Sequence, residues 1–344
     1  MTRRAFLGVS HLACVSALAA CGCTETLDAG HHRPHGLLPV DQRNSLIVVN
    51  DGAYDNWFGE YAVLLAGGGG KLAGIVVNAS PDWPDMAKNV DGWRGLVAAA
   101  RASGLENLPD PIASVESPLV MPASGEVDDT QPNRSEGARF IVDVSKRLGL
   151  PYRPLVVATG GALTDVADAY LIDPTVTERV VVVSSLGSVS SAGGAMGIPN
   201  GDGDPWADTI VTRRFRYVQV SAFYDQLTDV ADADVARLPD NALGSWIASK
   251  QPNLWHWSPA SDQVAVLAAA LPTFVTAVQR VSPAPPSDVD ADAGTDTDAG
   301  AAASTGPDLV SDPQGTGLLV TDCDGESATA RFWEALRSTR VTTP

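Results

Sequence analysis

Short apolar runs without a polar interruption recur along this chain and limit the folds that it can adopt. A strand with one face in water alternates polar and apolar residues, so uninterrupted runs predict strands that are buried on both faces. Segments with helical patterning separate the runs. Helices that alternate with doubly buried strands indicate an α/β fold, with an open, mainly parallel sheet covered by helices on both faces. The clearest runs are Leu46–Val49, Leu72–Val77, Leu155–Ala158 and Val180–Val183.

A sheet of this kind restricts where function can lie. Ligands bind beyond the carboxyl ends of parallel strands. We therefore expect the functional residues directly after Val49, Val77, Ala158 and Val183. A phosphate-binding loop at these positions is excluded, because Gly67–Gly70 follows a predicted helix instead of a strand.

Residues 1–20 have the features of an export signal. Arg3 and Arg4 precede an apolar run that is too short to cross a bilayer. The Arg-Arg-x-Phe-Leu pattern resembles a twin-arginine signal, and Leu18–Cys21 resembles a lipobox, in which Cys21 carries lipid. The alternative is an ordinary secretory signal with a chance cysteine. We predict an exported lipoprotein of the cell envelope, anchored to a membrane through Cys21 on the periplasmic face or the outer surface.

Composition divides the rest of the chain. Residues 21–44 are polar and predict a flexible tether, and one domain is expected over residues 45–344. Within it, residues 282–312 are rich in Asp, Pro and Ala and predict a disordered acidic insert. The net charge of −18 argues against a nucleic-acid partner, which requires a basic face. Of the four cysteines, Cys14 lies in the signal and Cys21 would carry lipid. The other two, Cys23 and Cys323, could form a disulfide.

The first apolar run ends in a cluster of oxygen-bearing side chains. Asp51 and Asp55 flank a turn that contains Gly52, and Asn56 follows directly. Hard cations such as Ca²⁺ prefer six to eight oxygen ligands. The alternative is a helix start, in which Asp55 or Asn56 caps free backbone N–H groups.

Two later segments can add oxygen atoms to that cluster. Thr159 ends another buried run and offers a backbone carbonyl, and Asp262 precedes the apolar helical segment 264–271. Capping of that helix is the alternative role for Asp262.

These segments together resemble the nucleoside hydrolase family, the calcium-dependent N-ribohydrolases of inosine and uridine preference. The resemblance covers roughly residues 45–340, in the family's order. The first strand of the family carries Asp-x-Asp-Pro-Gly-x-Asp-Asp, and further landmarks follow it. The matching stretches here are Val49–Asn56, Gly74–Val77, Ala158–Asp165, Asp173–Pro174, Asn200 to Asp208, Ser261–Ala265 and Arg331–Trp333.

The resemblance implies a role for each matching residue. Asp51, Asp55, Asn56, the Thr159 carbonyl and Asp262 would hold Ca²⁺, with Asp51 also acting as the general base on a calcium-bound water. The hydroxyl groups of the sugar would be bound by Asp55, Asp208 and Asp262, with Asn200 near its 5′ end.

The chain departs from the family pattern at several of these positions. Asn56 replaces an aspartate, which should weaken the binding of calcium. Trp206 stands where the family has a sugar-binding glutamate, so it is expected to contact the sugar, and Asp208 stands where the family has an asparagine. Ser261 replaces a histidine.

Other residues are candidates for the roles that these departures leave open. His256 can serve as the acid for the leaving group, with Trp255 or Trp257 stacked on the base; its alternative is a loop histidine between packed tryptophans. Asn78 or Asp82 can fill a further sugar contact.

The sequence therefore predicts Ca²⁺-assisted hydrolysis of the N-glycosidic bond of a ribonucleoside or a related N-glycoside. Two alternatives remain, a non-catalytic lipoprotein that binds a sugar or nucleoside on the same fold, and a hydrolase of a different glycoside. The expected partner is a small-molecule nucleoside or sugar. The resemblance also implies that copies of the chain can form a homo-oligomer.

Overall fold

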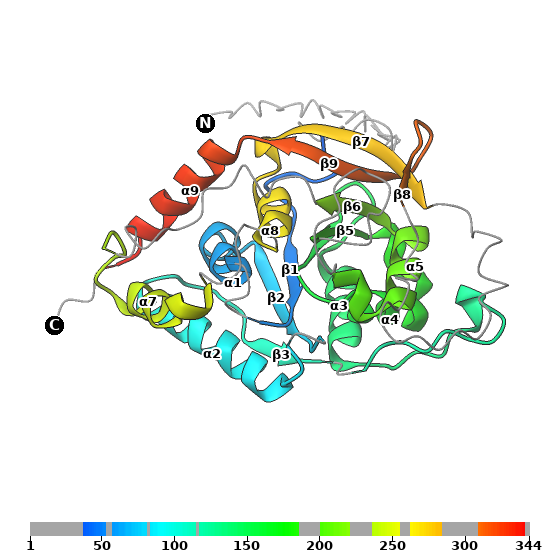
Figure 1. The fold of residues 1–344 in the computed structure, drawn as a ribbon, viewed down its shortest axis with the longest axis horizontal. Coiled ribbons are helices and arrows are strands. Elements are labelled where there is room, and N and C mark those ends of the chain that lie inside the picture. The colour runs from blue at the N-terminus through cyan, green and yellow to red at the C-terminus, as the bar shows by residue number, and fades with distance from the viewer. Residues whose placement is uncertain are drawn as a thin grey trace, which may run out of the picture. The chain divides into compact units, whose positions relative to one another are not determined.

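The computed structural model describes most of the chain beyond the N-terminal segment (Figure 1). The described residues are 37–52, 57–80, 83–114, 117–185, 200–220, 236–254, 262–283 and 309–340. They all lie in one compact unit, Arg33–Pro344. None of the helices in these ranges has both the length and the apolar character that a membrane span requires.

One sheet organises the described part of the chain. Its nine strands lie in the order β3-β2-β1-β4-β5-β6-β9-β7-β8. The strands from β3 to β9 in this order pair in parallel, and β7 runs antiparallel to both β9 and β8. The predicted open, mainly parallel sheet is therefore confirmed. The strands are β1 (Leu46–Asn50), β2 (Leu72–Val77), β3 (Pro111–Ala113), β4 (Leu155–Thr159), β5 (Val180–Ser185), β6 (Arg216–Val220), β7 (Val275–Pro283), β8 (Leu309–Ser311) and β9 (Gly317–Cys323).

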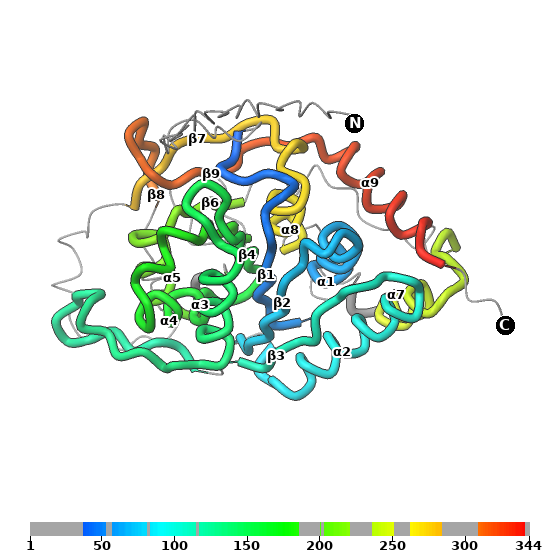
Figure 2. The backbone as a smooth tube through the Cα atoms, turned by 180° about the vertical axis from the view of Figure 1, so that it is seen from behind, coloured from blue at the N-terminus to red at the C-terminus, as the bar shows by residue number. Residues whose placement is uncertain are grey.

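Helices cover both faces of this sheet, as Figures 1 and 2 show from opposite sides. One face carries α3 (Glu136–Leu148), α4 (Thr164–Ile172) and α5 (Pro205–Arg214). The other face carries α1 (Phe58–Tyr61) with its π-helical continuation η2 (Ala62–Gly67), α2 (Met86–Ala102), α7 (Ala242–Leu254), α8 (Gln263–Ala270) and α9 (Gly325–Arg337).

The two cores explain why the strands are apolar throughout. Leu46 and Val48 of β1 pack into the core on the α8 side, whereas Ile47 and Val49 pack into the core on the α3 side. All four side chains are fully buried. Successive side chains of a strand point to opposite faces, so a sheet with helices on both faces needs an apolar residue at every position. Each such burial contributes about 1.5–3 kcal/mol.

Helix α8 is held at its carboxyl end by a lysine. Lys71, just before β2, donates from Nζ to the carbonyl oxygens of Ala269 and Ala270, at 3.2 and 3.0 Å. A cation at the last carbonyls of a helix satisfies acceptors that have no partner within the helix and complements its dipole. Burial lowers the pKa of Lys71 to about 8. The contact fixes α8, whose other end begins with Asp262.

The structure moves two predicted boundaries. Leu38 and Val40 are buried in the core, so the domain begins before Ser45 and the predicted tether is too long. Strands β7 and β8 include residues 282–283 and 309–311, which lie inside the predicted acidic insert. These strands escape prediction because β7 is partly exposed and pairs with β9 in a shifted register, which breaks the alternation. Residues 284–308 lie outside the described ranges.

Candidate functional site

The carboxyl ends of β1, β2, β4 and β5 meet at one edge of the sheet, which we call the carboxyl edge. Asp51, Asn78 and Thr159 follow or end three of these strands and are almost fully buried. The structure thus brings three of the predicted site residues to the expected place. Asn200, Trp206, Asp208 and Asp262 are also described and are taken up below. Seven residues named in the sequence analysis lie outside the described residues: Asp55, Asn56, Asp82, Trp255, His256, Trp257 and Ser261.

Two asparagines fix the loop that follows β4. Asn50, the last residue of β1, donates from Nδ2 to the Gly160 carbonyl at 3.0 Å. Asn78 donates in the same way to the Ala162 carbonyl at 3.0 Å. The backbone N–H of Gly160 also bonds the Val49 carbonyl at 3.0 Å. The loop that carries Thr159 is therefore held against the ends of β1 and β2. Asn50 was not predicted as a site residue; its signal was a polar residue at the end of an apolar run.

Glycines let this loop approach the first strand closely. A Cβ atom on Gly161 would lie 3.0 Å from Asn78 Oδ1 and 3.3 Å from the backbone nitrogen of Asp51. A Cβ atom on Gly160 would lie 2.5 Å from the ring of Phe58 and 2.9 Å from Asn50 Nδ2. The predicted Thr-Gly-Gly segment thus acts by allowing the loop to touch Asp51.

This packing predicts that Gly160→Ala damages the site. The added methyl group must displace Phe58 or Asn50, and overpacking of this kind costs about 1–3 kcal/mol. We expect a lower urea midpoint. Gly69→Ala is the matched control, because a Cβ atom there meets nothing within 4 Å. Equal stability of the two variants would contradict the close contact.

Asp51 is a buried carboxylate at the carboxyl edge. Its side chain is 2% exposed, and Oδ1 accepts the N–H of Gly52 at 2.7 Å. A carboxylate that is bonded to the next backbone N–H has a fixed orientation. Asp51 therefore has the burial and the orientation that a metal ligand or a general base requires.

Asp262 directly precedes α8, at the N-cap position, but its side chain does not cap the helix. Four other helices begin with a side chain that accepts a backbone N–H, from Asp85, Ser135, Asp204 and Asp324. Asp262 makes no such bond and is 3% exposed. Its Oδ1 instead accepts Nδ2 of Asn200 at 3.1 Å, and the same amide donates to the Ser185 carbonyl at 3.0 Å. The capping alternative for Asp262 is therefore wrong.

Asn200 and Asp262 thus meet beside the end of β5, as two members of the predicted sugar and metal site. Their contact joins the segment before α5 to the start of α8. Because β5 lies next to β4 in the sheet, this pair and Thr159 belong to the same edge.

The described donors suit a hard cation, although they do not complete a site. Asp51, Asp262 and the Thr159 carbonyl present oxygen atoms only, which is the ligand type of Ca²⁺. Within the described ranges, no three His, Cys, Asp or Glu side chains form a group that could hold a metal. Asp55 and Asn56 would have to supply the remaining oxygens.

Trp206 and Asp208 lie on α5. Trp206 donates its indole N–H to Thr130 Oγ1 at 2.9 Å and packs against the core on the α3 side. Asp208 is buried, and its charge, after burial itself, is a cause of the raised pKa of Tyr217 in β6. In the part of the chain described, Trp206 is bonded to Thr130 and Asp208 is buried near Tyr217. The predicted contacts of both side chains with the sugar stay predictions.

A second polar cluster, which the sequence did not reveal, lies beside Asn78. Asp165 Oδ1 accepts the hydroxyl groups of Ser114 and Ser135. Each hydroxyl in turn accepts a backbone N–H from the first turn of α3, from Gly137 and Ala138 respectively. Burial raises the pKa of Asp165 to about 6. The cluster joins the starts of α3 and α4 and supports the carboxyl edge from below the loop.

Comparison with known proteins places this fold. No family model matches the chain, and no curated protein matches its sequence. Among solved structures, it is similar to an inosine-guanosine nucleoside hydrolase, with a TM-score of 0.60 and 17% identity over 86% of this chain and 99% of the other. An inosine-uridine preferring nucleoside hydrolase from Bacillus anthracis gives 0.59 and 13%, over 86% and 100%. A purine-preferring ribonucleoside hydrolase from Gardnerella vaginalis gives 0.56 and 17%, over 85% and 98%. The chain therefore has a nucleoside-hydrolase-like fold.

Proposed function

We propose that this protein hydrolyses the N-glycosidic bond of a ribonucleoside or a related N-glycoside, with Ca²⁺ bound at the carboxyl edge. The observation that carries the proposal is the contact of Asn200 with the buried carboxylate of Asp262. The Asp262 carboxylate accepts the Asn200 amide instead of capping α8, and Asp51 lies buried at the same edge. The resemblance of the sequence and the similarity of the fold both support a nucleoside as the substrate.

The chemistry assigns a separate task to each described group. Cleavage of a glycosidic bond passes through a state with positive charge on the sugar, which buried carboxylates such as Asp262 stabilise. Asp51 takes the proton of the attacking water. Bound Ca²⁺ would be held by Asp51, Asp262 and the Thr159 carbonyl with Asp55 and Asn56, and it would lower the pKa of a water in the site. Asn200 holds the Asp262 carboxylate in place through its amide.

The direct test is an assay of the purified protein with a panel of purine and pyrimidine ribonucleosides. Free base and reducing sugar are measured with 1 mM-range Ca²⁺ and again after chelation, on the order of concentrations met outside cells. We expect release of base that depends on calcium and that returns when calcium is restored.

Two results would reject the proposal in different ways. Tight binding of ribose or nucleoside with no release of base would identify the non-catalytic binding protein. Release of sugar from other glycosides, with all nucleosides intact, would identify a hydrolase of a different glycoside.

A further inference from the structure

The opposite edge of the sheet carries an exposed patch that the proposed reaction does not use. Between α3 and β4 the chain turns at the amino ends of the strands. Exposed apolar and basic side chains lie in this turn, and Arg213 is exposed in the last turn of α5, just before β6. We call the group the amino-edge surface. Its members are Arg147, Leu148, Leu150, Tyr152, Arg153 and Arg213.

The apolar members are exposed in an unusual number. Leu148, Leu150 and Tyr152 are 40%, 36% and 48% exposed, and they lie within five residues of one another. They account for half of the six large apolar side chains that are exposed in the described ranges. Single exposed apolar residues need no explanation, but a group of them indicates a surface that contacts another body.

The charge of this surface is opposite to that of the chain. The whole chain carries −18, yet Arg147, Arg153 and Arg213 are exposed and have no ion-pair partner among the described residues. Two neighbouring acids, Asp128 and Asp173, already pair with Arg214 and Lys146. Asp143 and Glu178 are the further acidic residues on these segments. A basic excess beside apolar side chains suits an anionic lipid surface.

Local contacts make the turn rigid. Leu150 and Arg153 exchange two backbone hydrogen bonds of 3.0 Å. Arg216, at the start of β6, donates to the carbonyls of Pro151 and Glu178 at 3.2 and 3.3 Å. The exposed side chains are therefore held on a preformed surface, which reduces the entropy lost on binding.

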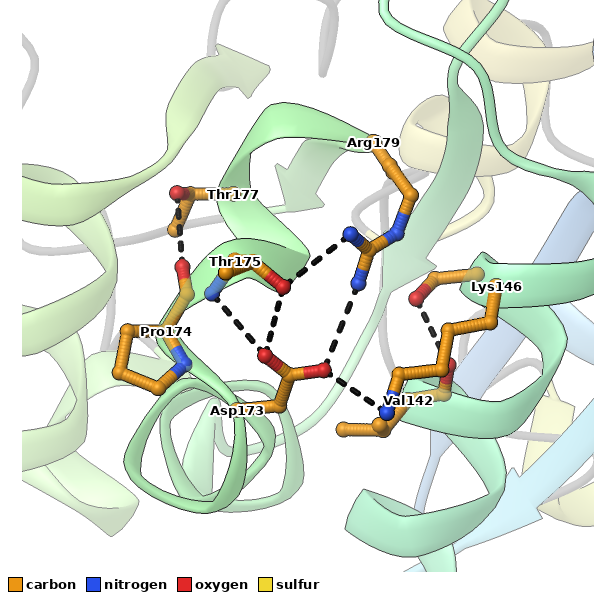
Figure 3. Close-up of polar contacts among 8 residues, drawn as sticks. Val142, Lys146, Asp173, Pro174, Thr175, Thr177 and Arg179 are labelled. Atoms are coloured by element: carbon orange, nitrogen blue, oxygen red, sulfur yellow. Dashed lines mark hydrogen bonds and ion pairs between the residues drawn. The ribbon is translucent and has the colours of Figure 1, made fainter.

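Asp173 fixes the neighbouring helix end (Figure 3). Its carboxylate accepts the hydroxyl and the N–H of Thr175 at 2.6 and 3.1 Å, and it pairs with Lys146 at 2.9 Å and with Arg179 at 3.5 Å. The contact ties the last turn of α3 to the end of α4 and the start of β5. Lys146 is thus ion-paired within the protein. The positive charge that can bind a partner therefore lies on Arg147, Arg153 and Arg213.

The chain enters β1 next to this surface. Asn44 donates from Nδ2 to the Pro154 carbonyl at 2.6 Å, and Val156 bonds the Ser45 carbonyl at 2.9 Å. Leu37 lies 16 residues after Cys21, the predicted site of lipidation. Even when fully extended this stretch reaches about 55 Å, so an anchor at Cys21 keeps the domain within that distance of the membrane.

We propose that the amino-edge surface docks on an anionic lipid surface when the protein is anchored. Arg147, Arg153 and Arg213 attract the headgroups, and Leu148, Leu150 and Tyr152 enter the interface. Strand β4 begins at this surface with Leu155 and ends with Thr159 at the carboxyl edge. Docking therefore turns the candidate site away from the lipid, so that it stays open to a water-soluble substrate.

Sedimentation with vesicles tests the proposal without any assay of activity. The chain from residue 22 onward, which contains the compact unit Arg33–Pro344 and lacks Cys21, is mixed with vesicles of phosphatidylglycerol and phosphatidylcholine or of phosphatidylcholine alone. We expect binding to the anionic vesicles only, with a strong decrease as salt rises.

Two pairs of variants locate the binding surface. Arg147→Glu with Arg153→Glu should reduce the partition coefficient at least about tenfold, whereas Arg139→Glu with Arg331→Glu, the same charge change on exposed positions elsewhere, should not. Leu150→Ser with Tyr152→Ser should also reduce binding, whereas Val120→Ser with Met121→Ser, at 80% and 59% exposure, should not.

Three results would overturn the proposal. They are failure of the wild type to bind anionic vesicles at low salt, equal losses in the test and control variants, and a concentration-dependent dimer that the Leu150 and Tyr152 changes abolish. The last result would assign the surface to a second copy of the chain. Because the readout is vesicle binding, loss of the proposed nucleosidase activity would leave it unaffected.

Discussion

Asp51→Asn is expected to lower kcat/KM for the nucleoside substrate at least about 10³-fold. The substitution keeps the shape of a side chain that is 2% exposed and keeps an oxygen that can accept the Gly52 N–H. It removes the negative charge that a general base and a calcium ligand both need. Stability should change little, while the affinity for Ca²⁺ measured by calorimetry should fall together with activity.

Asp168→Asn is the matched control for this experiment. Asp168 is also a fully buried carboxylate, but it accepts the backbone N–H groups of Arg134 and Ser135, which are not candidate site residues. The amide keeps only one oxygen for these N–H groups, so the protein should lose stability while kcat/KM stays within a few-fold of the wild type. The assignment of Asp51 fails if its variant retains more than a tenth of the activity, or if both variants lose activity equally.

Glu60→Gln is expected to stabilise the protein at high pH. Glu60 lies on α1, is fully buried, and neither carboxylate oxygen has a hydrogen-bond partner in the described part of the chain. Burial raises the pKa of Glu60 from 4.5 to about 8. The folded state therefore holds the proton more tightly than the unfolded state does. This contribution to stability is fully present below pH 4.5 and is lost as pH rises through about 8.

The size of the effect follows from the same two values. A gap between pKa 4.5 and about 8 corresponds to on the order of 5 kcal/mol of unfolding free energy. Glutamine cannot ionise, so the variant should match the wild type near pH 4.5 and exceed it by several kcal/mol at pH 9. Urea denaturation of both proteins at a series of pH values measures the difference in their free energies of unfolding. The titration of Asp165 and of the other carboxyl groups affects both proteins equally and therefore cancels in this difference.

Glu126→Gln provides the comparison for Glu60, since Glu126 is exposed on the loop before α3. As a surface substitution, it should change the free energy of unfolding by no more than about 0.5 kcal/mol. Parallel curves for wild type and Glu60→Gln would show that the buried carboxyl group finds compensation in the folded state, and the raised pKa would then be wrong.

Patterns along the chain predict the parallel half of the fold well. Each position of β1, β4 and β5 faces one of two cores, so the apolar runs carry an unambiguous signal. The antiparallel β7 and β8 gave no such signal, because β7 is partly exposed and irregularly paired. Helix α5 escaped prediction as well, since its polar residues Asp208 and Thr212 are buried instead of facing water.

The candidate site was predictable in its position but not in its contacts. Strand order decides which loops meet, and the carboxyl ends of parallel strands gave the correct edge. Whether Asp262 caps its helix or bonds Asn200 depends on a residue 62 positions away, which no local pattern reports. The same limit applies to Asp165, whose partners Ser114 and Ser135 come from two other segments.

The short last strand of the sheet has a consequence for how copies of this chain meet at high concentration. Strand β8 has three residues and leaves the outer edge of the sheet without a further described strand. Such an edge is a template on which a second chain can add a strand and begin aggregation. The connection from β7 to β8, residues 284–308, carries six aspartates and no lysine or arginine. Because this connection starts at the end of β7 and ends at the start of β8, its charge is expected to oppose the edge-to-edge pairing of two copies.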